Sequence, residues 1–273
     1  MDLVTVTATI DKDMFLLQAH SLNLFVEHPV THWIIIEDDA LTEEEWLNSI
    51  RPIYNRHKFN LIYNPVSKDK FSSIGYLRQQ VFKFTVSEFI ENDYYIIIDS
   101  KNICIRQTDF CKIPSEGNHT ILLKEDYKFS IYYNWIIFLE IYLNKKLPDS
   151  VWSPETPFKM NTAITQNIVK TFDLTQVFAY DIRPSHSTEI SEFIFYRYFT
   201  DEVPKLRYGI NKTFWNSLPS IAELETLLIN EPECTMIGLH RSVIHTDFKK
   251  INDIVDWLIT HGLDEKYINF LRK

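Results

Sequence analysis

The stretch Asp93-Tyr94-Tyr95-Ile96-Ile97-Ile98-Asp99-Ser100-Lys101 decides the fold class predicted for this 273-residue chain. Its unbroken run of Tyr and Ile predicts a strand that is buried on both faces, as in a parallel sheet. Asp99 is the first carboxylate after that run. Because ligands of open α/β sheets bind at the carboxyl ends of the strands, we expect Asp99 at a binding crevice. The alternative is that Asp99 and Ser100 only end the strand or cap a helix.

Strands and helices alternate in the residues before this run. Clusters of β-branched and aromatic residues predict strands at residues 3–10, 33–36 and 59–63. Helices are predicted between them at about 15–26, 42–54 and 75–91, the second of them opened by a capping box of Thr42 and Glu45. This alternation predicts an α/β fold with a mostly parallel, Rossmann-type central sheet flanked by helices.

The pattern is less regular after Cys111. It predicts strands at 120–124, 129–133 and 235–239, and helices at 162–172, 187–199, 221–230 and within 251–271. The segment 135–143 fits a strand and a helix equally well. We therefore expect one domain over residues 1–273, with a smaller and partly antiparallel second part.

Composition and charge limit the function classes. A net charge of −9 opposes nonspecific binding of nucleic acid, because phosphates require a concentrated basic face. No apolar run approaches the roughly 18 residues of a membrane-spanning helix. The first residues lack the basic region of a secretory signal, so a cytoplasmic location is expected, with peripheral contact at the inner face of the membrane as an alternative. The cysteines Cys104, Cys111 and Cys234 form no metal-binding pattern and are expected to be buried thiols.

The five glycines form neither a dinucleotide fingerprint nor a P-loop. A bound nucleotide would therefore have to be held by carboxylates, amides and lysines.

Short strings along the chain resemble one enzyme class in their content and order. They are Arg78-Gln79-Gln80-Val81-Phe82-Lys83, Asp99-Ser100-Lys101, Thr156-Pro157-Phe158, Ser191-Glu192-Phe193 and Gly238-Leu239-His240-Arg241. Together with the strands they resemble nucleotide-sugar glycosyltransferases of the GT-A fold, and most closely a bacterial and viral family of uncharacterised glycosyltransferase-like proteins. The resemblance spans about residues 3–245.

The resemblance implies a GT-A-like domain and a hexosyltransferase-like activity. Residues 1–112 would form the nucleotide-sugar-binding half, 113–250 the acceptor-side half and 251–273 a C-terminal helical segment. The enzyme would move a sugar from a nucleotide-sugar donor to a glycan or lipid-linked acceptor, as in polysaccharide biosynthesis. No nucleic acid partner and no transmembrane segment are expected.

The chain departs from the family pattern at Lys101, where the second acidic residue of an Asp-x-Asp motif would stand. Mn²⁺ or Mg²⁺ is the cofactor that the resemblance implies, and these hard cations require oxygen ligands. An ammonium at this place removes a ligand, but it could itself neutralise a donor diphosphate. Two functions are therefore possible. The chain is either a metal-independent transferase or a catalytically inactive GT-A-like module that binds a glycan or a nucleotide.

The resemblance also implies roles for residues outside the Asp99 strand. Glu192 would be the general base that takes the proton of the acceptor hydroxyl. The donor would be bound by Asp11, Asp38, Gln80, Lys83, Asp99, Lys101, His240 and Arg241, with Asp99 acting in catalysis and Asp99 and His240 as the ligands if a metal is bound. The alternatives are helix caps for the aspartates, a solvated helix face for Gln80 and Lys83, a surface position for Glu192 and a buried hydrogen bond for His240.

Overall fold

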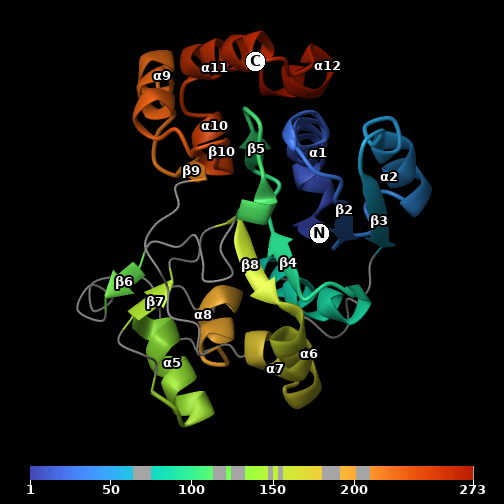
Figure 1. Cartoon of the computed structure of the whole chain (residues 1–273), viewed down its shortest axis with the longest axis vertical. Coiled ribbons are helices and arrows are strands. Elements are labelled where there is room, and N and C mark those ends of the chain that lie inside the picture. The colour runs from blue at the N-terminus through green and yellow to red at the C-terminus, as the bar shows by residue number, and fades with distance from the viewer. Residues whose placement is uncertain are drawn as a thin grey trace.

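The central sheet has five strands in the order β3-β2-β1-β4-β8 (Figure 1). The structure is a computed structural model, and it describes residues 1–63, 75–112, 121–123, 133–146, 150–152, 156–179, 191–200 and 210–272. Strands β1 (Asp2–Thr7), β2 (Thr31–Ile36), β3 (Lys58–Tyr63) and β4 (Tyr94–Ile97) are parallel, and β8 (Phe158–Asn161) is antiparallel to β4. The predicted mostly parallel α/β sheet is confirmed.

Crossover helices connect the parallel strands. They are α1 (Lys12–Phe25), α2 (Glu43–Ile50) and α3 (Gly75–Thr85), the last continued by a 3-10 turn, η3 (Val86–Phe89). Thr42 and Glu45 form the predicted capping box: the Thr42 hydroxyl accepts from Glu45 N at 3.2 Å, and the Glu45 carboxylate accepts from Thr42 N at 2.7 Å. The predicted apolar face of α1, from Phe15 to Val26, is buried.

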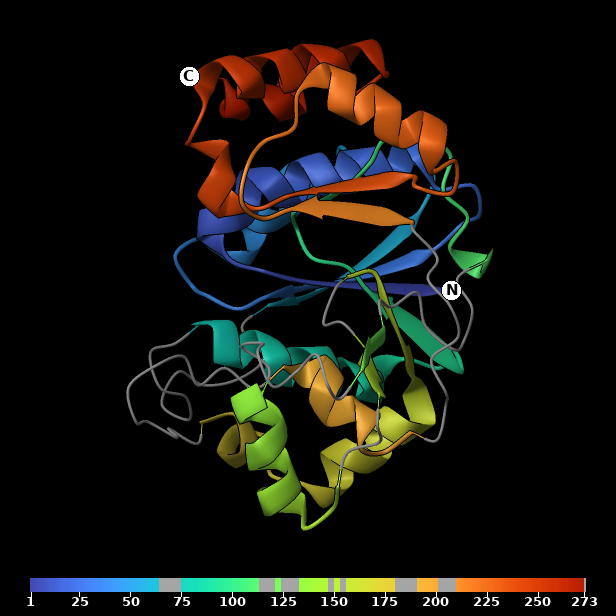
Figure 2. The ribbon, with the colours of Figure 1, turned by 90° about the vertical axis from the view of Figure 1, so that its left-hand side faces the viewer.

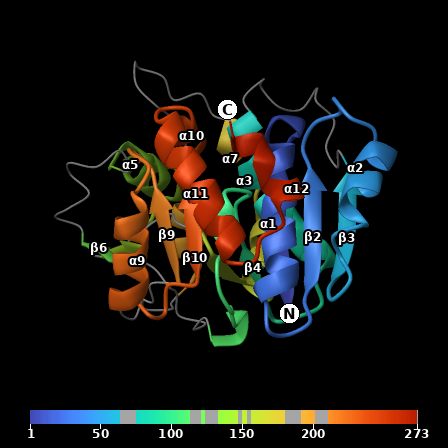
Figure 3. The ribbon, with the colours of Figure 1, turned by 90° about the horizontal axis from the view of Figure 1, so that it is seen from above.

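A second sheet of three strands lies on one side of the central sheet (Figure 2). Its order is β5-β10-β9, where β10 (Met236–Leu239) pairs antiparallel with β5 (Asn102–Cys104) and parallel with β9 (Asn211–Phe214). Helices α9 (Ile221–Asn230), α11 (Phe248–Thr260) and α12 (Glu265–Ile268) cover this sheet and α1 (Figure 3). Two short helical elements belong to the same side: α10 (Arg241–Ile244) and a 3-10 turn, η5 (Asn269–Leu271).

The other face of the central sheet is covered by α3 and by helices from the middle of the chain (Figure 2). These are α5 (Tyr133–Leu143), α6 (Thr162–Thr171), α7 (Leu174–Ala179) and α8 (Glu192–Arg197). A small antiparallel pair, β6 (Ile121–Leu123) and β7 (Ser150–Trp152), lies beside them. The aromatic residues Phe84, Phe158 and Phe195 fill the core between these helices and the sheet.

Four expectations need correction or a limit. The first strand ends at Thr7 instead of continuing to Ile10, because residues 9–11 form a 3-10 turn, η1 (Thr9–Asp11). Residues 135–143 are helical, and the predicted strand at 129–133 lies outside the described residues except for Tyr133, the first residue of α5. Cys104 and Cys234 are buried, but Cys111 is exposed. The predicted helix at 187–199 is shorter, since α8 begins at Glu192, and residues 187–190 are not described.

Candidate active site

A cavity of about 640 Å³ lies where the carboxyl ends of β1, β4 and β10 come together. Lys83, Lys101 and Arg241 line it, together with the carboxylates of Asp11 and Asp99. His240, His245 and Trp215 complete the polar and aromatic part of its wall. Three cations thus face two carboxylates in the cavity lining, although the whole chain carries a net charge of −9. This contrast points to an anionic ligand.

Asp99 lies two residues beyond β4, as the sequence predicts. A tight turn holds it: Asp99 N donates to Asn102 Oδ1 at 2.9 Å, and Asn102 N donates to Asp99 O at 2.8 Å. From α1, the Gln18 amide also donates to the backbone carbonyl of Asp99. The side chain is 27% exposed, so the carboxylate forms part of the cavity floor in a fixed position.

Both carboxylate oxygens of Asp99 accept hydrogen bonds. Lys83 Nζ lies 3.2 Å from Oδ1, Lys101 Nζ lies 2.6 Å from Oδ2, and the Thr156 hydroxyl donates to Oδ2 at 3.0 Å. Burial alone would raise the pKa of Asp99, but the ammonium groups of Lys101 and Lys83 hold it well below its usual range. Asp99 is therefore an anion at every physiological pH.

Lys83 links Asp99 to Glu192. Its ammonium donates to Glu192 Oε1 at 2.7 Å, and both side chains are almost completely buried, with exposures of 6% and 3%. Burial alone would lower the pKa of Lys83, yet the two carboxylates raise it above its usual range. Burial raises the pKa of Glu192, and Lys83 opposes that change. Lys83 stays charged, and its charge is what makes the buried Glu192 carboxylate tolerable.

Gln80 and Glu192 are buried behind the cavity wall. Gln80 is fully buried, and its side-chain oxygen accepts from Glu192 N at 3.0 Å, which ties α3 to the start of α8. Neither residue lines the cavity. The alternative of a solvated face for Gln80 and Lys83 is wrong, because both residues are buried and contact Glu192 of α8. The surface alternative for Glu192 is also wrong, since the residue is 2% exposed.

Asp11 and Asp38 follow neighbouring strands but differ in their surroundings. Asp11 lines the cavity, and its Oδ1 lies 3.9 Å from Arg241 Nη1 on the opposite wall. Burial raises the pKa of Asp11, while Arg241 and Lys101 oppose this change. Asp38 accepts from Thr9 N at 2.8 Å and from Thr9 Oγ1 at 2.7 Å. Asp38 therefore holds the 3-10 turn that presents Asp11, and it is not among the residues that line the cavity.

The opposite wall comes from the second sheet. His240 follows β10 directly and caps α10 through Ser242, with Ser242 Oγ 2.7 Å from His240 Nδ1. The His240 ring lies 4.6 Å from the Trp215 ring, and Lys101 Nζ lies 4.7 Å from the centre of that indole. Burial and Lys101 lower the pKa of His240, so its imidazole is neutral at pH 7. This side of the cavity thus combines an aromatic face with the cations of Lys101 and Arg241.

A buried carboxylate adjoins the cavity at the end of β2. Gln79, which lines the cavity, donates to Glu37 Oε1 at 2.8 Å. Burial raises the pKa of Glu37 to about 7. Within the described part of the chain, Glu37 Oε2 and the neighbouring Thr7 hydroxyl have no hydrogen-bond partner. Glu37 is thus a proton-binding group in the physiological range next to the cavity.

The sequence alone did not identify three of these contributors. Trp215 and Glu37 lie on no motif of the sequence, and Thr156 belongs to the string Thr156-Pro157-Phe158 without a role of its own. Of the three, Thr156 has the clearest sequence signal. Its hydroxyl belongs to a string shared with the resembled family, and a hydroxyl is a suitable hydrogen-bond donor to Asp99.

A divalent cation does not fit at Asp99 as the site stands. Its two oxygens are taken by ammonium groups, and a cation in contact with Asp99 would lie against the Lys101 ammonium, which bonds the same carboxylate at 2.6 Å. His240 uses Nδ1 in its cap, and in the described part of the chain Asp99 and His240 belong to no group of three or more His, Cys, Asp or Glu side chains whose ligand atoms lie within 4.8 Å of one another. The residues present instead supply positive charge directly.

One family model matches most of the chain. A model of a family described as "Family of unknown function (DUF6492)" matches residues 13–230. No curated protein matches the chain. No helix in the described ranges is long and apolar enough to cross a membrane.

Solved glycosyltransferases share the fold. Galactosyltransferase LgtC, in complex with donor and acceptor sugar analogs, is 11% identical with a TM-score of 0.58, over 96% of this chain and 95% of LgtC. The bifunctional glycosyltransferase WbbM is 10% identical with a TM-score of 0.54, over 100% of this chain and 51% of WbbM. GlyE of Streptococcus pneumoniae TIGR4 is 12% identical with a TM-score of 0.52, over 98% of this chain and 62% of GlyE. The chain has the GT-A glycosyltransferase fold, as predicted.

Proposed function

This chain belongs to DUF6492, a family of unknown function, and from its fold and its cavity we propose that it is a glycosyltransferase. The enzyme moves a sugar from a nucleotide-sugar donor to a hydroxyl of a glycan or lipid-linked acceptor. The observation that carries the proposal is the pair of ammonium groups on Asp99, at the strand edge where GT-A enzymes hold the donor diphosphate. The location in the cytoplasm, the polysaccharide acceptor and the division at residues 112 and 250 stay predictions.

Lys101 and Arg241 bind the donor diphosphate in this mechanism. Both line the cavity, and both present donors that form charge-assisted hydrogen bonds to phosphate oxygens. As the bond between the sugar and the diphosphate breaks, negative charge develops on the leaving phosphate. Cations already held in place stabilise that charge without reorganisation, which is the usual source of rate acceleration in such reactions. Asp99 fixes Lys101 at 2.6 Å and is therefore its positioning partner.

The nucleoside end of the donor is assigned to Asp11. Its carboxylate lines the cavity at the end of η1, where it can accept hydrogen bonds from ribose hydroxyls. Asp38 acts on this contact indirectly, because it holds the turn through Thr9.

Glu192 has two candidate roles, the general base that the resemblance implies and the positioning of Lys83. It is buried beneath Lys83 and does not line the cavity, so we propose that it positions Lys83 and not the acceptor hydroxyl. Gln80 supports the same arrangement by accepting from Glu192 N. The base role stays a prediction that kinetics can decide, because groups in an enzyme without its substrate can tighten on binding.

The second candidate function is a GT-A-like module that binds a nucleotide sugar or glycan without turnover. Lys101 favours it, because a lysine replaces the second acid of the metal-binding motif. The two functions differ in whether a bound donor is consumed.

A turnover assay separates the transferase from the binding module. UDP-, GDP-, CMP- and dTDP-sugars would be incubated with the protein in EDTA, with and without simple sugar acceptors, and the release of free nucleotide measured. The transferase predicts release by the wild type and a loss of about a hundredfold or more in Asp99→Asn, whose side chain has the same shape but no charge. Binding without release would establish the module, and neither binding nor release of any donor would refute both.

A further inference from the structure

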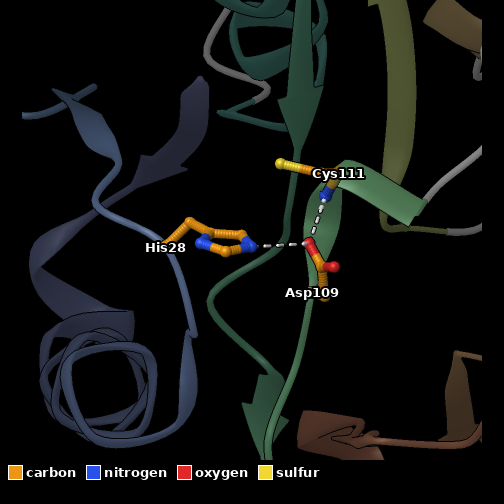
Figure 4. A group of neighbouring side chains, drawn as sticks. All are labelled: His28, Asp109 and Cys111. Carbon is orange, nitrogen blue, oxygen red and sulfur yellow. Dashed lines mark hydrogen bonds and ion pairs between the residues drawn. The ribbon is translucent and has the colours of Figure 1, made fainter.

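Three side chains with metal-ligating atoms meet at the edge of the central sheet opposite the cavity. His28 lies in the connection from α1 to β2, and Asp109 and Cys111 lie at a 3-10 turn, η4 (Phe110–Lys112), beyond β5 (Figure 4). Their ligand atoms all lie within 4.8 Å of one another. The cavity of the proposed function is at the carboxyl ends of the strands, whereas His28 precedes the first residue of β2. The cluster is therefore separate from the active site.

Backbone hydrogen bonds hold the two segments together. Thr108 N donates to Phe25 O at 2.8 Å, and Glu27 N donates to Thr108 O at 3.1 Å, around an isolated bridge between Val26 and Thr108. Phe110 is buried to 2% exposure and anchors η4 in the core. The backbone positions of the three residues are thus set by the fold, and little backbone entropy is lost when they bind a common ion.

The carboxylate is already oriented toward the other two groups. Asp109 Oδ1 accepts from Cys111 N at 2.9 Å and lies 3.9 Å from His28 Nε2. Figure 4 shows the Cys111 sulfur on the same side of the turn as the imidazole. In a tetrahedral zinc site with bonds of about 2.0–2.3 Å, the ligand atoms lie about 3.5 Å apart. Because the His28 side chain is 61% exposed, a rotation of the imidazole can close the remaining gap.

We propose that His28, Asp109 and Cys111 form a zinc site with one open coordination position. The set of one nitrogen, one oxygen and one sulfur ligand suits Zn²⁺ and is unsuited to Mg²⁺ or Ca²⁺, which prefer oxygen ligands alone. On binding, the Cys111 S–H bond breaks, a Zn–S bond forms, and the proton passes to water. The thiolate and carboxylate charges then balance the charge of the ion. The site clamps η4 to the connection before β2 and so stabilises the folded chain.

Protection of Cys111 from alkylation tests this site. Cys104 and Cys234 are buried and Cys111 is exposed, so iodoacetamide labels Cys111 first in the folded protein. With zinc at about ten times its dissociation constant, labelling followed by mass spectrometry should slow about tenfold, whereas the same concentration of Mg²⁺ should have no effect. Equilibrium dialysis should show one fewer bound zinc ion per chain in Cys111→Ser than in the wild type.

Matched variants separate this site from the cavity. His28→Gln and Asp109→Asn should lose the protection, and the Asn side chain can still accept from Cys111 N, so the turn itself is kept. Asp99→Asn should keep the protection, because it changes only the cavity. Unfolding midpoints without zinc check that each variant is folded. Equal protection in His28→Gln and wild type, or no protection in the wild type, would overturn the zinc site and leave the glycosyltransferase proposal unaffected.

Discussion

Replacing Lys83 by Met should destabilise the protein in a pH-dependent way. The ammonium of Lys83 lies 2.7 Å from Glu192 and 3.2 Å from Asp99, and the Lys83 and Glu192 side chains are nearly inaccessible to water. Met keeps most of the volume of the side chain but removes the charge. Asp99 retains Lys101 and Thr156 as partners, so the main consequence falls on Glu192.

The sign of the pH dependence follows from Glu192. Its pKa is raised by burial even with Lys83 beside it, so the loss of Lys83 raises it further. Between the ordinary pKa of 4.5 and this raised value, the folded state keeps a proton that the unfolded state releases. Stability of the variant therefore falls as pH rises through that window.

The loss in free energy of unfolding caused by Lys83→Met can be estimated at both ends of this pH window. Toward the low-pH end of the window, the protonated Glu192 of the variant has lost its hydrogen bond to Lys83, which costs about 1–3 kcal/mol. At pH 8 it is a buried and unpaired charge, or must take up a proton, and the cost approaches about 3–5 kcal/mol.

Urea unfolding followed by tryptophan fluorescence at pH 5 and pH 8 measures the difference. The double variant Lys83→Met, Glu192→Gln should lose the extra cost at pH 8, because no buried charge is left. Exposed Lys249→Met is the matched control and should change stability by less than about 0.5 kcal/mol at either pH. A cost for Lys83→Met that is the same at both pH values would refute the reasoning.

Three further results are expected. Burial raises the pKa of Glu37 to about 7, so Glu37 lowers wild-type stability as pH rises from about 4.5 to 7. Glu37→Gln should make that slope shallower in urea unfolding; an unchanged slope would place the titration elsewhere. Glu192→Gln should weaken donor binding by calorimetry and transfer together by about tenfold, whereas unchanged donor binding with transfer about a hundredfold slower would make it the general base. Trp215→Ala should weaken donor binding about threefold to tenfold, because Lys101 loses its contact with the indole ring. The unfolding midpoint should stay unchanged because Trp215 is 42% exposed, and Trp215→Phe should restore much of the affinity.

The sequence predicts those parts of the structure that depend on local patterns. The apolar run before Asp99 is a strand in the middle of the sheet, and the Thr42–Glu45 capping box opens α2. Both signals act over a few residues, so they do not depend on distant parts of the chain. The alternation of strands and helices predicts parallel strands, and Asp99 lies at the carboxyl end of one of them, where ligands of such sheets bind.

Contacts between distant segments could not be predicted in the same way. Lys83 and Glu192 are 109 positions apart, and only the packing of α8 on α3 brings them together. The polar residues of α3 have the spacing of a solvated face, and nothing within the helix shows that α8 covers them. The first strand ends early for a related reason, since Asp38 from the next strand end holds Thr9 in a turn.

The wall with Trp215 was missed because it belongs to a second sheet. That sheet joins β5, β9 and β10, which are far apart in the sequence. His240 and Arg241 were identified only through a family resemblance. Trp215 carries no motif, and its role is visible only from its contacts with Lys101 and His240.

The central claim is that the side-chain cations of Lys101 and Arg241 take the place of a metal ion in holding the donor diphosphate. Calorimetric titration of the best-bound nucleotide sugar in EDTA and then in Mn²⁺ tests it most directly. We predict equal affinity of the wild type in both, a loss of about tenfold or more in Lys101→Ala, and binding that requires Mn²⁺ in Lys101→Asp. If EDTA abolishes binding in the wild type, a metal is held by other ligands, such as Asp99 with His240, and the claim is wrong.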